Sequence, residues 1–243
     1  MRTGSRGVTL IEMLIAVSLL SILTVGLALV LRVGLSALDK VNAKLMANRR
    51  AASVQRILRS EIESFIPATG VCPGAPGIPP SKIAFFDGRP DSMRLVSSYS
   101  LQEAARGAPR ILEFHVIPGE QDKGVRLIVN ETIYAGPLST LGMCLGVLPD
   151  PETGRTRPRF APIEAGSRSF VLADRLAYCR FSYRRALPPP ALEQWLPAWI
   201  FPDWPTAVRV DMAPLEPDST RVPLVTATVP IRVNRQPMVS YAD

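Results

Sequence analysis

An apolar run near the N-terminus, residues 8–31, reads VTLIEMLIAVSLLSILTVGLALVL. Glu12 is the only ionisable side chain in these 24 residues, and a short polar segment with Arg2 and Arg6 precedes them. A helix of this length measures about 36 Å, whereas the hydrocarbon core of a bilayer is about 30 Å thick. The run is too long for the apolar region of a cleaved secretory signal. The sequence therefore predicts one transmembrane helix near the N-terminus.

The rest of the 243-residue chain has a different composition. All 24 prolines follow residue 66, so long helices are expected only upstream of that point. The net charge of +7 and the share of apolar residues are ordinary for a globular protein. One histidine, His115, and three cysteines exclude multi-histidine metal sites and cysteine-rich zinc modules. Much common enzyme chemistry is excluded with them, and no P-loop, dinucleotide fingerprint or G-x-S-x-G motif occurs.

Helical periodicity continues beyond the apolar run. Apolar residues recur at three- and four-residue steps with charges on the other faces, which predicts an amphipathic helix that Pro67 ends. The basic run at residues 49–59 lacks interleaved aromatic residues, so it is interpreted as a solvated helix face and no nucleic-acid partner is expected. The apolar stripe, expected to pack on a globular domain, consists of Leu38, Val41, Leu45, Ala51, Val54, Leu58, Ile62 and Phe65.

Short strand-like segments follow a Gly/Pro-rich stretch at residues 69–81. The sequence predicts an α+β fold, in which a long N-terminal helix, transmembrane then amphipathic, packs on an antiparallel β-sheet domain. Pro223 and Pro230 place parts of the last segment at a sheet edge. The expected strands are Lys82–Phe86, Met93–Ser97, Arg110–Ile117, Val125–Tyr134, Ser169–Leu172, Leu176–Tyr183, Ala207–Met212 and Val222–Val233.

Glu12 needs a physical account, because a carboxylate in hydrocarbon must lie near an interface, be protonated or be paired. One interpretation is an interfacial glutamate whose carboxylate reaches the lipid headgroups. The other comes from the surrounding segment 7–14, GVTLIEML. This segment closely resembles the cleavage and methylation motif of type IV prepilins and type II secretion pseudopilins. The shared features are a basic leader ending in Gly, a hydrophobic first mature residue, and an apolar helix with an early Glu.

This resemblance implies a processing site and an assembly role. Prepilin peptidase would cut between Gly7 and Val8, and Val8, where the family commonly has Phe, would become the N-methylated first residue. Glu12 would be the fifth mature residue, whose carboxylate in this family pairs with the N-terminal amine of a neighbouring subunit. Each charge is costly alone in the membrane, and the cost falls when subunits stack in register.

Charge alone leaves the orientation open. A positive-inside count puts the C-terminal body in the cytoplasm, whereas Cys72 and Cys144, in loop-like sequence, weakly favour an exported body. The resemblance implies a cytoplasmic leader and a periplasmic body on a single-pass inner-membrane protein. The basic residues after the span are Arg32, Lys40, Lys44, Arg49 and Arg50.

The C-terminal half carries a second, less sharp resemblance. Segment 176–183 (LAYCRFSY), then Trp195 and Trp199, then segment 205–212 (PTAVRVDM) look like the J-type minor pseudopilin of type II secretion. That family has a strand ending in F-x-Y, a tryptophan-containing loop and a P-x-A-V-R-V-like strand. The resulting pseudopilin-fold organisation is a leader at 1–7, a transmembrane helix at 8–31, an amphipathic helix at 32–66 and a periplasmic β-rich domain at 67–243.

The implied function is that of a non-enzymatic minor pseudopilin. It would co-assemble at the pseudopilus tip, initiate assembly and support protein export across the outer membrane. Its partners would be other minor and major pseudopilins, prepilin peptidase, the inner-membrane assembly platform and membrane lipid, without a cofactor. One alternative is a minor pilin of a type IV pilus or competence system, and another is a membrane-anchored periplasmic enzyme or binding protein.

The remaining candidates have structural interpretations. The candidate disulfide is Cys72 with Cys144, because Cys179 is in phase with core-type aromatic residues, although a pair with Cys179 stays open. His115 beside Glu113 is interpreted as a partly exposed strand histidine rather than an acid/base pair. The three tryptophans pack a Pro-rich loop or contact another tip subunit. Four acidic residues are too scattered for a calcium site: Asp203, Asp211, Glu216 and Asp218.

Overall fold

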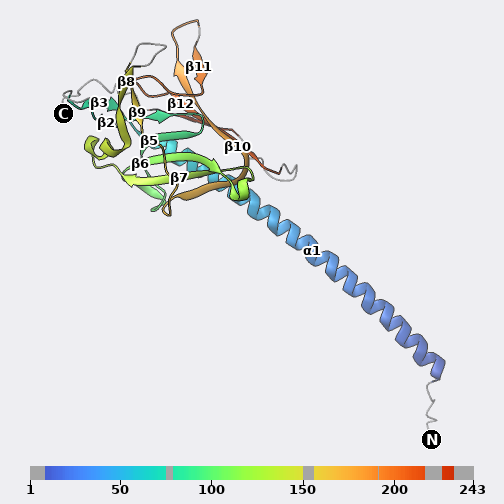
Figure 1. Ribbon diagram of the computed structural model, residues 1–243. Coiled ribbons are helices and arrows are strands. Elements are labelled where there is room, and N and C mark those ends of the chain that lie inside the picture. The colour runs from blue at the N-terminus through green and yellow to red at the C-terminus, as the bar shows by residue number, and fades with distance from the viewer. Residues whose placement is uncertain (1–8, 75–78, 150–155, 191, 217–225, 233–243) are drawn as a thin grey trace. The chain divides into compact units, whose positions relative to one another are not determined.

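The computed structural model describes residues 9–74, 79–149, 156–190, 192–216 and 226–232. In this part of the chain one long helix, α1, precedes a series of strands (Figure 1). The chain divides into two compact units, Met1–Arg49 and Arg50–Asp243, and α1 contributes to both. The elements are α1 (Leu10–Glu63), β1 (Phe65–Ile66), β2 (Thr69–Cys72), β3 (Ser81–Ala84), β4 (Asp87–Gly88), β5 (Ser92–Ser100), β6 (Ala105–Pro118), the 3₁₀ helix η1 (Glu120–Asp122), β7 (Val125–Ile133), the 3₁₀ helix η2 (Pro137–Met143), β8 (Cys144–Pro149), β9 (Thr156–Phe160), β10 (Phe170–Ala186), β11 (Glu193–Leu196), β12 (Ala207–Pro214) and β13 (Ala227–Pro230).

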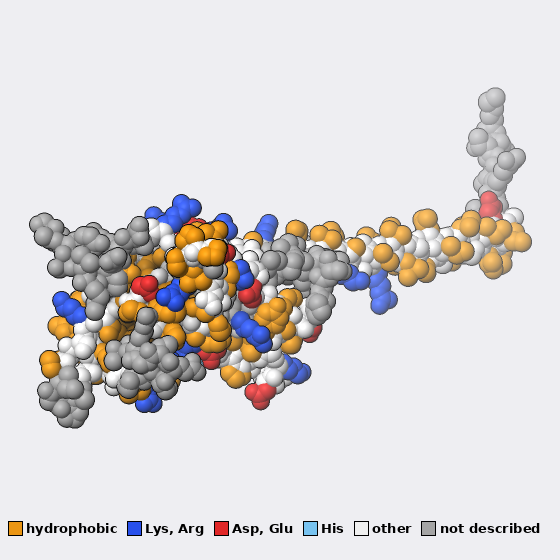
Figure 2. Space-filling model, turned by 90° about the horizontal axis from the view of Figure 1, so that it is seen from above, with side chains coloured by type: hydrophobic (Ala, Val, Ile, Leu, Met, Phe, Trp, Pro, Cys, Tyr) orange, Lys and Arg blue, Asp and Glu red, His pale blue; other side chains and the backbone are white. Residues whose placement is uncertain are grey.

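The first unit consists of the apolar part of α1. Its segment Leu10–Asn42, 33 residues, is long and apolar enough to cross a membrane, and the protein itself buries none of it. Hydrophobic side chains follow one another along this part of the helix on the face seen in Figure 2. Its hydroxyl groups donate to backbone carbonyls one turn back, as Ser21 does to Val17 at 2.8 Å and Ser36 to Val33 at 2.9 Å. These bonds satisfy the hydroxyl protons, which a hydrocarbon environment requires.

The second unit begins with the last turns of α1. Val54, Leu58 and Ile62 are buried at four-residue steps, so they lie on one helix face and enter the main hydrophobic core. The expected apolar stripe is confirmed here. Its upstream part, however, stays exposed, since Leu38 and Val41 keep 60% and 53% of their surface. The buried part of the stripe therefore begins at Ala51.

The helix ends at Glu63, slightly before the expected boundary. Ile66 precedes Pro67, and the ring of a proline disfavours helical backbone in the residue before it. Phe65 and Ile66 instead form β1, which pairs with Ser97 and Val96 of β5. The helix is thus tied to the sheet by backbone hydrogen bonding as well as by apolar packing.

Nine of the described strands form one antiparallel sheet, with the main order β1-β5-β6-β7-β10-β12-β13. Strands β11 and β4 pair with β10 and β5 outside this path. A long N-terminal helix followed by a large antiparallel sheet confirms the α+β fold class and is consistent with a pseudopilin fold. Pro230 lies on β13 at the end of the main path, where a missing backbone N–H is tolerated.

The two faces of this sheet bury different clusters, because successive side chains of a strand point to opposite faces. Leu95, Leu112 and Phe114 pack in the core that contains the last turns of α1. Val96 and Ile111 belong to a second cluster on the other face, together with residues of β2, β8 and β9. The hairpins β2-β3 and β8-β9, each a two-stranded sheet, therefore cover the face opposite to the helix.

Several strands differ from the expected ones. A single strand, β10, replaces the two expected at 169–172 and 176–183, because an irregular register and Arg175 at φ 54° interrupt its alternation without ending it. Strand β2 lies in the stretch expected to be a loop. Strands β8 and β9 were not expected, because their glycine and prolines weaken the strand pattern.

Candidate functional site

The first turn of α1 places Thr9 and Glu12 together. The Glu12 N–H donates to the Thr9 carbonyl at 3.1 Å and lies 3.4 Å from its Oγ1. This Thr-x-x-Glu spacing is that of a helix capping box, and an acidic residue in the first turn is stabilised by the helix dipole. Glu12 is exposed, and no cationic side chain in the described residues lies within ion-pair distance of it. Its carboxylate is therefore available to a group outside the described chain.

The other two residues of the expected processing site, Gly7 and Val8, lie outside the described residues. The described chain begins at Thr9, which is the second residue after the expected cleavage point. Their roles in cleavage and methylation stay predictions.

Cys72 and Cys144 are joined by a disulfide, with their Cα atoms 5.2 Å apart. The bond connects the end of β2 to the start of β8, so it links the two hairpins that cover one face of the sheet. Both cysteines are buried in the second cluster. Cys179 is free and buried in the main core, where burial raises the pKa of its thiol to about 12. Such a thiol is unreactive at neutral pH.

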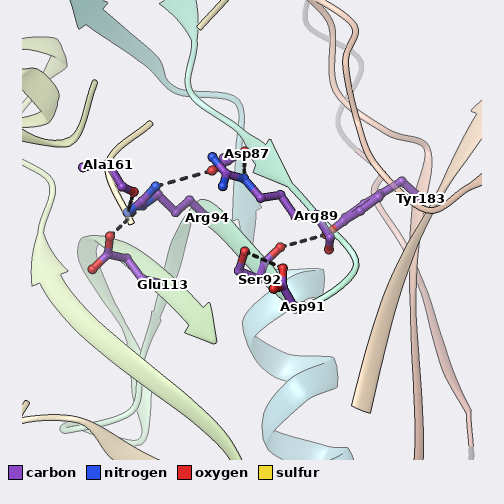
Figure 3. A network of polar contacts seen from close by, with 8 residues as sticks. All are labelled: Asp87, Arg89, Asp91, Ser92, Arg94, Glu113, Ala161 and Tyr183. Atoms are coloured by element: carbon purple, nitrogen blue, oxygen red, sulfur yellow. Dashed lines mark hydrogen bonds and ion pairs between the residues drawn. The ribbon is translucent and has the colours of Figure 1, made fainter. Parts of the chain in front are cut away.

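A buried ionic network, missed in the sequence, centres on Arg94 (Figure 3). Arg94 is 2% exposed, and its Nε donates to Glu113 Oε1 at 2.6 Å. Its other nitrogens donate to the Ala161 carbonyl at 2.6 Å and to Asp87 Oδ2 at 3.4 Å, and its guanidinium faces the Phe160 ring. The only sequence signal was an arginine inside the apolar strand segment 93–97.

The same network fixes the short strand β4. Burial raises the pKa of Asp87, and the Arg89 and Arg94 guanidiniums oppose that shift. The hydroxyl of Tyr183 donates to the Arg89 carbonyl at 2.9 Å (Figure 3). The Tyr183 ring lies directly against Gly88. A Cβ added at Gly88 would meet the Tyr183 ring at 2.7 Å, so this close approach requires glycine. The segment 87–89 is therefore held rigidly against β5 and β10.

Beside this segment lies a groove of about 670 Å³. Strands β3, β4, β8 and β9 and the loop 198–202 form its walls. Among the described residues its lining is basic, with Lys82, Arg89, Arg157 and Arg159, and Asp87 is the one acidic residue there.

His115 and Glu113 do not form a catalytic pair. Glu113 is engaged by Arg94, whereas His115 is half-buried on β6 and its Nδ1 has no hydrogen-bond partner within the described residues. The expectation of a partly exposed strand histidine is confirmed.

Glu61, near the end of α1, is a buried acid that the sequence did not single out. It is fully buried, and neither carboxyl oxygen has a hydrogen-bond partner in the described chain. Burial, with a smaller contribution from the neighbouring Glu131 charge, raises its pKa to about 8. The carboxylate of Glu131, by contrast, accepts hydrogen bonds from the Ser100 hydroxyl and the Leu101 N–H. Glu61 is therefore protonated at neutral pH.

The tryptophan-containing loop packs on the body. Trp199 is buried in the main core and donates to the Asp203 carbonyl at 2.6 Å. Trp204 packs edge-on against Phe65. The structural interpretation of these two tryptophans is confirmed. Trp195 is half-buried on β11, and the Arg209 guanidinium lies 3.9 Å from its ring centroid.

Two of the four acidic residues weighed for calcium have other partners. Asp211 accepts a hydrogen bond from Thr226, and Glu216 pairs with Arg175 at 2.7 Å. Asp218 lies outside the described residues. No group of three or more potential metal ligands occurs in the part of the chain that the structure describes.

Comparison with protein families matches residues 2–28 to the prokaryotic N-terminal methylation motif. The match spans the basic leader, the expected cleavage point and the start of α1, including Glu12. The N-terminus is therefore similar to that of type IV prepilin-like proteins, which are membrane-anchored structural subunits rather than enzymes. Such a motif implies processing by prepilin peptidase and assembly with other pilin-like subunits. No curated protein matches the chain.

Proposed function

We propose that the chain is a minor pseudopilin of a type II secretion system, of the J type. The observation that carries the proposal is the prepilin-type motif at 2–28, running directly into a long apolar helix whose first turn contains Glu12. The β-rich body after the helix is consistent with it. In this role the protein co-assembles with other pseudopilins at the pseudopilus tip, initiates assembly there and supports export across the outer membrane.

The proposed maturation has two steps. Prepilin peptidase cuts between Gly7 and Val8, and the new N-terminus of Val8 is methylated. The leader is residues 1–7, the membrane segment is 8–31, the amphipathic helix is 32–66 and the body is 67–243. The body lies in the periplasm, a compartment in which the Cys72–Cys144 disulfide forms and persists.

Glu12 gives the assembled helix its register. Its carboxylate lies in the first turn, where the protein supplies no ion-pair partner from the described residues. The N-terminal amine of an adjacent subunit is a cation of the right kind, and pairing the two removes the cost of two isolated charges in hydrocarbon. The capping-box role of Glu12 is a competing local explanation, and it does not require the charge, because glutamine also serves at this position.

The assignment to the J type draws on the C-terminal half. The F-x-Y strand is part of β10, the P-x-A-V-R-V strand is β12, and the two pair with Phe181 opposite Val210. Trp195 lies on β11, which pairs with the end of β10. The elements that carry the resemblance thus lie side by side in one sheet.

Deletion of the gene separates the proposal from its nearest alternative. For a type II pseudopilin, folded exported proteins accumulate in the periplasm, while surface pili and DNA uptake are unchanged. For a minor pilin of a type IV pilus or competence system, export is unchanged and piliation or DNA uptake is lost. The second outcome would overturn the proposed secretion role.

Glu12 variants test the assembly role. Glu12→Gln keeps a capping-box side chain but loses the charge, so partner pseudopilins should no longer co-purify with it although it is inserted and cleaved normally. Thr9→Val is the matched control, because it removes the capping hydroxyl and keeps the carboxylate. If the control loses partners and Glu12→Gln retains them, helix capping rather than charge explains Glu12.

A further inference from the structure

The basic groove runs along the edge of strand β3. All four residues of β3, Ser81–Ala84, line it, and so do four consecutive residues of β9, 157–160. Successive side chains of a strand point to opposite sides, so a surface touched by every residue lies along the edge of the strand. The groove therefore follows the edge of β3, and on its other side it contacts both strands of the β8-β9 hairpin, through Val147 and Leu148 as well as residues 157–160.

Both strands have an edge without a strand partner among the described residues. Strand β3 pairs only with β2, and β9 pairs only with β8. Free edges present backbone N–H and C=O groups that can accept an added strand. Pro158 removes one N–H group from β9, whereas every residue of β3 retains its own. The edge of β3, about 13 Å long at 3.3 Å per residue, is thus the better template.

The charge of the groove selects the kind of strand that fits. Among the described residues, four cationic side chains line it against one carboxylate, and that carboxylate, Asp87, is already held by Arg89 and Arg94. Lys82 lies on β3 itself and is exposed, as is Arg159 across the groove on β9. An edge lysine discourages indiscriminate pairing, and an acidic strand is the class that it attracts instead of repelling.

A single-stranded nucleic acid is also anionic, but the groove does not suit it. Such ligands need exposed aromatic rings on which bases stack. Phe86, Phe160 and Trp199 line the groove, yet they are only 5%, 3% and 7% exposed. Phe201 is half-buried, and the Arg185 guanidinium lies over its ring at 3.7 Å. These rings are therefore too buried or too engaged to stack on bases.

We propose that this groove binds an extended acidic peptide of a partner protein, which adds as a strand to the free edge of β3. The Arg94 network and the Tyr183–Arg89 hydrogen bond hold the adjoining segment 87–89 in place, so the site is preformed. The groove lies wholly within residues 81–202, and the inference does not depend on which secretion or pilus system the protein serves.

The test uses the full chain in non-ionic detergent and three fluorescent eight-residue peptides. One alternates glutamate and valine, the second alternates lysine and valine, and the third is the acidic peptide with N-methyl groups on alternate amides. Fluorescence anisotropy should show saturable binding of the acidic peptide, about tenfold weaker or absent binding of the basic one, and loss of binding on N-methylation. Added salt should weaken the binding.

Two charge-reversal variants test whether the peptide binds in the groove. Arg159→Glu, in the groove, should weaken binding of the acidic peptide about tenfold, whereas Arg168→Glu, an equally exposed arginine that does not line the groove, should leave it unchanged. Equal effects of the two variants, or equal binding of the N-methylated peptide, would overturn strand addition in favour of general charge attraction. Displacement of the peptide by an equal concentration of oligothymidylate would overturn the peptide assignment itself.

Discussion

Arg94 and Glu113 lie directly opposite each other on β5 and β6, and a 2.6 Å ion pair joins their side chains. The arginine is 2% exposed, so the pair lies in a low-dielectric interior. Breaking such a pair from one side leaves a buried charge without compensation. Loss of either partner is therefore expected to destabilise the sheet face that carries the second cluster.

We expect Arg94→Met to destabilise the protein by about 3–5 kcal/mol, because Glu113 and Asp87 lose their buried cation. The double variant Arg94→Met/Glu113→Leu should be less unstable than the sum of the single changes. Denaturant unfolding of the full chain in detergent, followed by near-ultraviolet circular dichroism, measures both. A cost of less than about 1 kcal/mol for Arg94→Met would show that the pair is not a stabilising unit.

The contact between Gly88 and Tyr183 gives a second prediction. Gly88→Ala should cost about 1–3 kcal/mol, since its Cβ meets the buried Tyr183 ring at 2.7 Å and the ring has no room to move. Gly142→Ala is the matched control, because nothing lies within 4 Å of the Cβ that it adds. Thermal unfolding of the two variants should therefore differ. Equal unfolding midpoints for the two variants would mean that β4 does not pack tightly against the Tyr183 ring.

The Cys72–Cys144 disulfide closes a loop with a sequence separation of 72 residues. Its removal by Cys72→Ser/Cys144→Ser should cost about 4 kcal/mol by the loop-entropy relation. Alkylation in denaturant without reductant, read by mass spectrometry, should modify one cysteine in protein purified from its native compartment, namely Cys179. Three modified cysteines would mean that the protein folds in a reducing compartment and would contradict the proposed periplasmic location.

Glu61 should make stability depend on pH. Its pKa rises from 4.5 to about 8 on folding, so the folded state holds a proton that the unfolded state releases between these values. The resulting stability is fully present below about pH 4.5 and is lost as the pH rises towards 8, by an amount of order a few kcal/mol. Glu61→Gln should flatten this dependence.

The matched control for Glu61 is on the same helix. Glu63→Gln changes an exposed carboxylate paired with Arg59 at 3.9 Å, and it should leave the pH profile as it is. Unfolding free energies measured at intervals from pH 5 to pH 8 give the comparison. A parent protein whose stability is constant over that range would contradict the buried, protonated state of Glu61.

Those parts of the fold that depend on local pattern could be predicted from the sequence. Val54, Leu58 and Ile62 recur at helical spacing, and the helix face that they define is buried. The segment 125–134 is rich in β-branched residues, which favour strands, and it forms β7 with nearly the same bounds. The hairpin β8-β9 was missed because Gly146 and Pro158 weaken the local strand signal, while its stability comes from the disulfide and from Phe160 in the second cluster.

In the candidate site, too, features that depend on local sequence could be predicted, and features that depend on long-range contacts could not. The processing motif in segment 7–14 could be predicted from the order of its residue types. Gly7 and Val8 of this motif lie outside the described structure. Arg94 and Glu113 are 19 residues apart, and only the register of β5 with β6 brings them together. The groove depends on where β3 and β9 lie, and tertiary packing of two hairpins decides that. Long-range relationships of this kind leave no periodic trace in a single sequence.

Intact-mass analysis of the protein purified from its native membrane tests directly whether the N-terminus is processed as a prepilin. We expect a chain that begins at Val8 and carries one extra methyl group, and a chain that keeps its leader when prepilin peptidase is absent. Mature protein that still begins at Met1 or Arg2 in the presence of the peptidase would contradict this expectation.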